Sequence, residues 1–127
     1  MAIGSFCIVL HGHMPYVLRH GLWPNGEDWL YEAAAETYLP LLSLIDRCVF
    51  LNCNPKLTIG LTPVLLEQLA QEHFKKGFHA YLADYMDRAR SDRHQFEQQG
   101  QGHMAYLASL WEDFYCSTAI LRVVTCR

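Results

Sequence analysis

In the first half of the chain, short apolar runs typical of strands take turns with segments that have the apolar periodicity of helices. Ile3 to Leu10 is a short, nearly continuous apolar run, which is typical of a strand buried on both faces of a parallel sheet. A second short run, KLTIGL at residues 56–61, predicts another strand. Thr62 and Pro63 follow it as N-cap and first helical residue, so a helix is expected to begin there.

A long loop and a helix are predicted between the two strands. Residues 11–29 (HGHMPYVLRHGLWPNGEDW) contain several glycines and prolines, which favour turns over regular structure. The pattern becomes helical from Asp28, and residues 39–51 are apolar on most sides, which predicts a buried helix. Pro40 is expected to kink or restart this helix, and the NCNP sequence at residues 52–55 ends it. The order strand, helix, strand, helix predicts an α/β fold with a parallel sheet.

The second half of the chain predicts two amphipathic helices. The first follows Gly77, covers residues 78–99 and is about five to six turns long. Gly100 and Gly102 end it, and the second helix covers residues 103–121. The residues expected on the apolar face of the first helix are Tyr81, Tyr85, Met86, Ala89 and Phe96. Those expected on the apolar face of the second are Met104, Leu107, Leu110, Trp111, Phe114 and Thr118.

Composition excludes several classes of function. The 127 residues amount to about one domain, and an apolar fraction of 51% indicates a globular chain. A net charge of −3 gives no electrostatic reason to expect nucleic acid or an anionic membrane as a partner. The N-terminus has no basic region of a signal peptide, and no segment is apolar for long enough to span a bilayer. The five cysteines form no C-x-x-C pair, so we expect reduced thiols in a cytoplasmic protein.

Two strands are too few for an independent parallel sheet. No third strand is predicted before the chain ends, so the chain is expected to be the first part of a larger domain. The last residues, LRVVTCR, contain β-branched side chains that interrupt the helical pattern. This ending suggests a truncation or an altered reading frame, and we regard residues 117–127 as doubtful.

His11 and His13 lie at the end of the first predicted strand, and alternate residues of a strand point to the same face. The carboxyl end of such strands is where α/β proteins bind ligands. One interpretation is a metal site, because imidazole is a common zinc ligand and some metal-dependent hydrolases use H-x-H. A catalytic zinc needs a third protein ligand, and the other histidines show no matching spacing.

The second interpretation is a sugar-binding cleft. A neutral imidazole offers one donor and one acceptor to sugar hydroxyls, and Tyr16, Trp23 and Trp29 offer aromatic faces for pyranose rings. Glu27 follows the turn closely enough to face such a cleft, whereas Asp28 is better explained as a helix N-terminal charge. The structural alternative is that the histidines cap the strand and the aromatic residues pack beneath the loop.

Three segments carry a family resemblance. LHGHMPYV, HGLWPNGEDWLYEAAAETYLPLL and LTIGLTPVLLEQLA closely resemble the start of family-57 glycoside hydrolases, and within them the 1,4-α-glucan branching enzymes. The similarity runs from about Phe6 to about Phe114 and fades at CSTAILRVVTCR. H-x-H-x-P-Y is the first motif of the family, and the W-P-x-G-E-x-W segment is more specific to the branching group.

The resemblance implies the N-terminal portion, residues 1–127, of an incomplete (β/α)7 barrel. It implies an enzyme that cleaves an α-1,4 glucan bond and transfers the chain to a 6-hydroxyl, with retention and without a metal cofactor. Retention needs two carboxylates roughly 5–5.5 Å apart. The family's nucleophile and acid/base lie in later motifs that this chain lacks, so we expect the chain alone to be inactive.

On this resemblance His11, His13 and Tyr16 are expected to line a sugar subsite, with Trp23 and Glu27 as weaker candidates. The expected partner is an α-glucan polysaccharide or oligosaccharide. Two alternatives stay open on the residues themselves. The chain is then either part of a metal-dependent hydrolase that uses the H-x-H motif or a non-catalytic helical interaction module.

Overall fold

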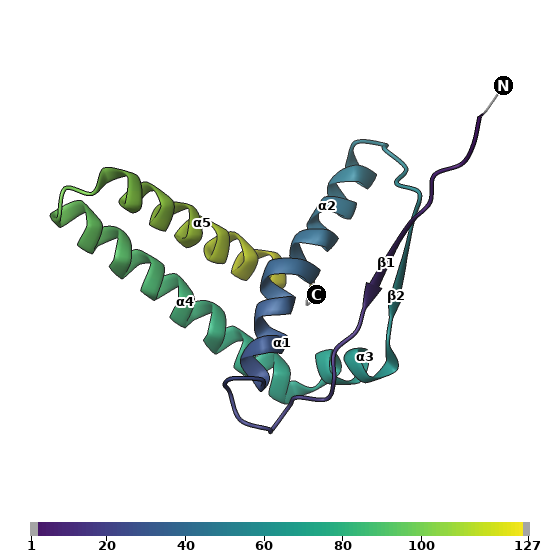
Figure 1. The fold of residues 1–127 in the computed structure, drawn as a ribbon, viewed down its shortest axis with the longest axis horizontal. Coiled ribbons are helices and arrows are strands. Elements are labelled where there is room, and N and C mark those ends of the chain that lie inside the picture. The colour runs from purple at the N-terminus through teal and green to yellow at the C-terminus, as the bar shows by residue number, and fades with distance from the viewer. Residues whose placement is uncertain (1–2, 126–127) are drawn as a thin grey trace.

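The computed structural model describes residues 3–125, and the side chains from Ile3 to Ala119. Two short strands and a series of helices follow one another along the chain (Figure 1). Their bounds are β1 Ile8–Gly12, α1 Glu27–Ala33, η1 Ala34–Tyr38, α2 Leu39–Phe50, β2 Leu57–Leu61, α3 Pro63–Ala70, α4 Glu72–Gln98 and α5 Gly102–Thr125. Cys126 and Arg127, the last residues of the doubtful tail, lie outside the described residues.

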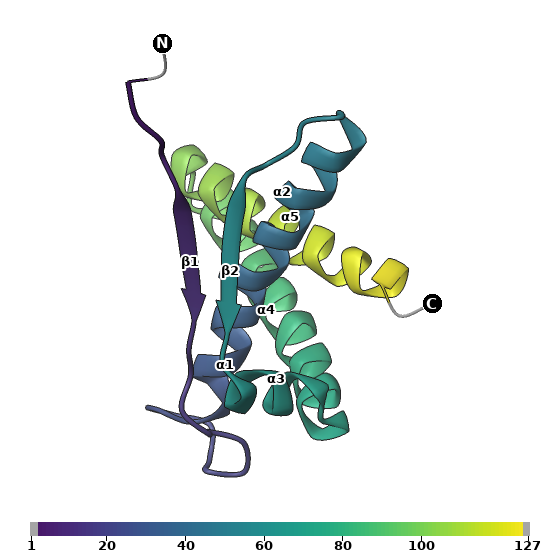
Figure 2. The same ribbon diagram turned by 90° about the vertical axis from the view of Figure 1, so that its right-hand side faces the viewer.

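The two predicted strands exist and pair in parallel, with His11 opposite Gly60. The expected strand from Ile3 to Leu10 is wrong at both ends, because β1 begins at Ile8 and reaches Gly12. Burial on both faces is also wrong, since Val9 is 66% exposed. The physical reason is visible in Figure 2, where no helix or strand of the described chain lies in front of the sheet. Within residues 3–125 there is no third strand.

One continuous rod of helix follows the long loop (Figure 1). It begins at Glu27, one residue before the predicted Asp28. Pro40 was expected to kink or restart the helix. In the structure the π-helical turn η1 lies directly before α2, and Pro40 stands at the start of α2. Proline has no N–H and fits the start of an α-helix, where Pro40 stands in α2. The wider π turn therefore lets the rod continue past the proline.

Helix α2 is not buried within the described chain, contrary to the prediction for residues 39–51. None of its residues is buried, and Leu42 and Phe50 are 53% and 85% exposed. The apolar pattern reports which side chains favour burial but not whether anything covers them. Helix α2 and the sheet therefore both present exposed apolar side chains within the described chain.

The hairpin of α4 and α5 forms the other arm of the molecule (Figure 1). Helix α4 begins at Glu72 rather than after Gly77, so that glycine lies inside the helix. A Cβ at this position would collide with the hydroxyl of Tyr31, which explains why a helix interior carries glycine here. The predicted break is confirmed at Gly100, whose φ of 69° is left-handed.

The predicted apolar face is buried or partly buried on α4 but mostly exposed on α5. On α4, Tyr81 and Ala89 are buried and the other members of the predicted face are partly buried. On α5 most of the predicted face is exposed, and as far as Ala119 the buried residues are Ala105, Ala108, Tyr115 and Thr118. Small side chains face α4 because they let the two helices approach closely. The helix runs to Thr125, so the expected interruption at LRVVT is wrong for the backbone.

The core lies between the long loop and the helices rather than on the sheet. Its buried members are Met14, Val17, Leu18, Leu30, Tyr31, Ala34, Ala35, Leu65, Phe74, Phe78, Tyr81, Leu82 and Tyr115. The part of the loop that follows the histidines is therefore anchored in the core. Among residues 3–125, no helix is both long and apolar enough to cross a membrane.

Candidate functional site

The two histidines lie side by side at the carboxyl end of β1. Their ring centroids are 6.2 Å apart and the ring planes are inclined by 16°. Both side chains are exposed. Between them, a Cβ on Gly12 would stand 2.7 Å from Cδ2 of Leu61 on β2. A larger residue here would force the end of the Leu61 side chain to shift. The strand period places both imidazoles on one face as predicted.

Tyr16 follows the histidines on the same loop and is 45% exposed. Nε2 of Gln71 donates a hydrogen bond to the Tyr16 hydroxyl at 3.0 Å. The ring of His20 meets the Tyr16 ring edge-on, with the centroids 6.2 Å apart. These contacts restrain the tyrosine from two directions while leaving nearly half of its surface open.

Gln68, on α3, fixes the loop between the histidines and the core. Its side chain is fully buried, and Oε1 accepts a hydrogen bond from the Val17 N–H at 2.7 Å. Nε2 donates to the carbonyl oxygens of Pro15 at 3.0 Å and Val64 at 3.3 Å. A buried amide that satisfies buried backbone groups rigidifies the segment it binds. The role of Gln68 was not predicted from the sequence, although a polar side chain within the apolar PVLLEQLA helix was a signal.

Glu27 holds the far end of the loop. Its Oε1 accepts the Arg19 N–H at 2.6 Å and lies 2.8 Å from Nε2 of His73, while the Tyr31 hydroxyl donates to Oε2 at 2.8 Å. Burial alone raises the pKa of this carboxyl, but the hydrogen bonds from Arg19, His73 and Tyr31 outweigh it and lower the pKa from 4.5. The group therefore remains a carboxylate although it is only 7% exposed.

Glu27 also explains the turn at Arg19, whose φ of 65° is unusual for a residue with a side chain. The hydrogen bond from the Arg19 N–H to Glu27 stabilises this conformation. His73 is the second residue of this site that was not predicted from the sequence. Only the fold brings it to Glu27, since 46 positions separate them.

Trp23 lies on the outer part of the loop and is 81% exposed. It lines a pocket of about 220 Å³ together with Trp29 and the carboxylates of Asp28 and Glu32. This pocket does not include the two histidines. The structure thus brings His11 and His13 together, places Tyr16 a few residues further along the anchored loop, and puts Trp23 and Glu27 in separate surroundings.

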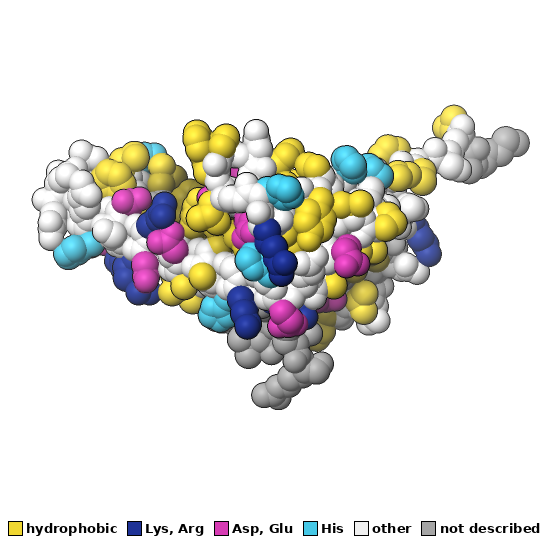
Figure 3. All heavy atoms as spheres, turned by 90° about the horizontal axis from the view of Figure 1, so that it is seen from below, with side chains coloured by type: hydrophobic (Ala, Val, Ile, Leu, Met, Phe, Trp, Pro, Cys, Tyr) yellow, Lys and Arg dark blue, Asp and Glu magenta, His cyan; other side chains and the backbone are white. Residues whose placement is uncertain are grey.

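The described residues contain no group of three or more histidine, cysteine, aspartate or glutamate side chains placed to hold a metal ion. Figure 3 shows one face of the molecule, on which hydrophobic and histidine side chains are interspersed with charges of both signs. No broad patch of one charge sign appears on this face.

Two relatives have sequences similar to a large part of this chain. It is 47% identical over 79 residues to the 1,4-alpha-glucan branching enzyme of Thermococcus kodakarensis, which covers 62% of this chain and 12% of that enzyme. It is 42% identical over 86 residues to a probable 1,4-alpha-glucan branching enzyme of Mycobacterium tuberculosis, which covers 68% of this chain and 16% of that protein. A comparison with models of protein families finds no match.

Two solved structures share the fold. The GH57-type branching enzyme of Pyrococcus horikoshii matches with a TM-score of 0.76 and 37% identity, over 87% of this chain and 21% of that one. An alpha-amylase of Thermotoga maritima matches with a TM-score of 0.79 and 25% identity, over 94% of this chain and 22% of that one. The chain therefore spans about a fifth of these structures.

Both kinds of comparison agree with the motifs. The aligned sequences are those of glucan branching enzymes, and a matching fold is that of a GH57-type branching enzyme. The resemblance that the sequence motifs indicate is confirmed, and the chain is a relative of the family-57 glucan branching enzymes that matches a part of their length.

Proposed function

We propose that this chain supplies one wall of the glucan subsite of a retaining 1,4-α-glucan branching enzyme. The observation that carries the proposal is the pair of parallel imidazoles, His11 and His13, at the carboxyl end of β1. Tyr16 follows on the loop that Gln68 anchors in the core. Ligand binding at the carboxyl ends of parallel strands is the general rule for α/β folds.

The chemistry of these side chains suits an α-glucan. Each neutral imidazole both donates and accepts a hydrogen bond, as a sugar hydroxyl does. The half-exposed ring of Tyr16 offers an apolar face to a pyranose ring. Trp23 lies in a separate pocket and is a weaker candidate for contact with the glucan. Glu27 acts through the loop it anchors, because both of its oxygens already have partners.

We propose that β1 and β2 are two neighbouring strands of a larger (β/α)7 barrel, of which residues 1–127 form the N-terminal portion. The exposed apolar side chains of the sheet and of α2 support this, since further strands and helices of the barrel would cover them. The whole enzyme is then expected to act in the cytoplasm, in the synthesis of a glycogen-type glucan.

Catalysis is not expected from the chain alone. A retaining mechanism needs a nucleophile and an acid/base, which the family resemblance assigns to later motifs of the family. A branch-linkage assay on amylose with the purified chain is expected to give no α-1,6 linkages. The appearance of new branches would contradict the proposed division of the active site.

Glucan contact is tested by calorimetric titration of the chain with maltoheptaose. We expect saturable binding, and none for cellohexaose, whose β-linkages give the chain a different shape. Absence of any binding of maltoheptaose would overturn the proposed function. A second titration, with zinc, tests the metal-dependent alternative. Stoichiometric zinc binding by the parent chain that is lost in His11→Ala would favour this alternative over the glucan subsite.

A further inference from the structure

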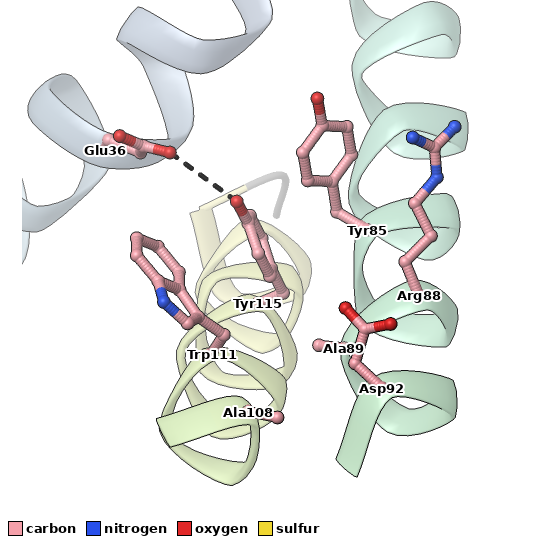
Figure 4. A pocket seen from close by; sticks show the side chains of 8 residues that line it. All are labelled: Glu36, Tyr85, Arg88, Ala89, Asp92, Ala108, Trp111 and Tyr115. Carbon is pink, nitrogen blue, oxygen red and sulfur yellow. Dashed lines mark hydrogen bonds between the residues drawn. The ribbon is translucent and has the colours of Figure 1, made fainter. Parts of the chain in front are cut away.

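A pocket of about 340 Å³ lies away from the strand end, where the α4–α5 hairpin meets η1. Figure 4 shows its lining, which is rich in aromatic rings and in carboxylates. The lining residues are Glu36, Tyr85, Arg88, Ala89, Asp92, Ala108, Trp111 and Tyr115. Its volume is within the range of roughly 300–1,000 Å³ that small-molecule sites have.

Trp111 forms one wall of this pocket, and its orientation is fixed. The indole ring stacks on Tyr115 with the centroids 5.8 Å apart, and Phe114 meets it edge-on at 5.6 Å. Nevertheless 49% of the tryptophan is exposed. A large ring held rigidly by its neighbours and half open to solvent can bind a flat apolar surface with little loss of entropy.

The hydrogen-bonding groups of the pocket come from three elements. In Figure 4 the Glu36 carboxylate from η1 lies above the Tyr115 hydroxyl from α5, which donates to its Oε1 at 3.5 Å. Burial and the nearby Glu36 charge raise the pKa of Tyr115 to about 12, so the hydroxyl keeps its proton. On α4, Asp92 is exposed beside the pocket.

Charge selects among the ligands that such a pocket could hold. The guanidinium of Arg88 lies 5.3 Å from the centroid of the Tyr85 ring, which it covers, and pairs with Asp84 at 2.7 Å. Because Asp84 neutralises Arg88, the charges that a ligand would meet are the carboxylates of Glu36 and Asp92. They repel an anionic ligand, whereas a neutral ligand rich in hydroxyl groups can donate hydrogen bonds to them.

We propose that this pocket is a second binding site for a neutral oligosaccharide of α-1,4-linked glucose, with Trp111 as its stacking platform. This inference rests on the proposed function and extends it to a different part of the surface. The pocket uses none of the side chains proposed at the strand end. A polymer held at two points gains binding strength from the raised local concentration at the second point.

A protein partner is the other occupant to be distinguished. Trp111 also lines a neighbouring hollow of about 460 Å³, with Leu107, Leu110 and Phe114, and this hollow is more apolar. A partner protein would cover both hollows, whereas a sugar needs the ring and the carboxylates. The oligosaccharide is favoured because the rigid ring and the carboxylates of Glu36 and Asp92 line the same pocket.

The test follows the three indole N–H signals of the full chain, labelled with nitrogen-15, during titration with maltoheptaose. The three tryptophans are Trp23, Trp29 and Trp111, and substitution of each by phenylalanine assigns its signal. We expect the Trp111 signal to shift and saturate. A Trp111 signal that does not shift while the chain still binds maltoheptaose would keep the proposed function and overturn the second site. A saturating Trp111 shift with an affinity that is unchanged in His11→Ala would overturn the proposed function instead.

Two variants with matched controls locate the binding. Trp111→Ala is expected to weaken binding at this site about tenfold, whereas Tyr106→Ala, an exposed aromatic residue on the same helix, leaves it unchanged. If Trp111→Ala fails to fold, Asp92→Ala gives the same test without loss of packing, with the exposed Asp113→Ala as control. Either of two results would overturn the proposal in favour of a protein-covered face: no Trp111 shift with maltoheptaose in the parent chain, or a Trp111 shift that saturates in Asp92→Ala as it does in the parent.

Discussion

Gln68 binds the backbone of Val17 across a separation of 51 residues, with Oε1 accepting the Val17 N–H at 2.7 Å. The same amide donates to the Pro15 carbonyl, so one side chain satisfies the backbone on both sides of Tyr16. The segment that carries the histidines is thereby joined to the helix that follows β2. The position of the candidate subsite therefore depends on this amide.

Gln68→Leu is expected to destabilise the chain by about 2–4 kcal/mol. The substitution keeps the volume but leaves buried backbone groups unpaired, each at a cost of about 1–3 kcal/mol. Urea unfolding followed by circular dichroism measures the change. Gln95→Leu, an exposed glutamine on α4, is the control and is expected to shift stability by less than about 0.5 kcal/mol. Equal effects of the two substitutions would contradict the anchoring role.

The stability of the chain should fall in acid partly through Glu27. Burial raises the pKa of the Glu27 carboxyl, but the hydrogen bonds to it lower the pKa by more. The pKa of this carboxyl in the folded chain is therefore below 4.5. The stabilisation is therefore complete above the ordinary pKa and is lost as the pH falls through the folded one.

Glu27→Gln should be less stable than the parent at about pH 7, and the difference should shrink at about pH 3. Urea midpoints across this range measure the effect. Glu67→Gln, an exposed glutamate on α3, provides the matched control. A difference between Glu27→Gln and the parent that stays constant over the whole range would show that the carboxylate charge is not involved.

Gly77→Ala should destabilise the chain, although alanine is the better helix former by about 1 kcal/mol. The added Cβ would collide with the Tyr31 hydroxyl, which also donates to Glu27. We expect a net loss of about 1–3 kcal/mol, as for other overpacked positions. At Gly102 nothing lies near a new Cβ, so Gly102→Ala is expected to be neutral or slightly stabilising in thermal unfolding. A stabilising Gly77→Ala would refute the packing account.

Thr62 occupies the predicted N-cap position, but its hydroxyl makes no capping hydrogen bond and is buried without a hydrogen-bond partner among the described residues. Thr62→Val should therefore change stability by less than about 0.5 kcal/mol, or increase it, instead of the roughly 1 kcal/mol that a capping threonine contributes. Thr118 is the comparison, because its Oγ1 donates to the Phe114 carbonyl at 2.8 Å. Thr118→Val should lose about 1 kcal/mol in the same unfolding experiment.

Local signals in the sequence predicted much of the fold. The strand at Leu57–Leu61, the helix start at Pro63 and the break at Gly100 are each set by short-range backbone preferences. The parallel pairing of the strands followed from the order of elements. These features need no knowledge of distant contacts.

Long-range packing decided the features that were missed. Gly77 looked like a helix breaker, because nothing in the sequence shows that Tyr31 packs against it. The burial expected for residues 39–51 failed because the described chain places no element over most of α2. In the site, the strand period predicted the His11 and His13 pair, whereas the partners Gln68 and His73 depend on the tertiary fold.

The central claim is that the paired imidazoles contact an α-glucan. The most direct measurement is the affinity for maltoheptaose of His11→Ala and His13→Ala, compared with that of His103→Ala, an exposed histidine on α5. Each strand-end substitution should weaken binding about three- to tenfold, as expected for the loss of hydrogen bonds worth about 0.5–1.5 kcal/mol, and the control should bind like the parent. Equal affinities for the parent and both strand-end variants would contradict the account.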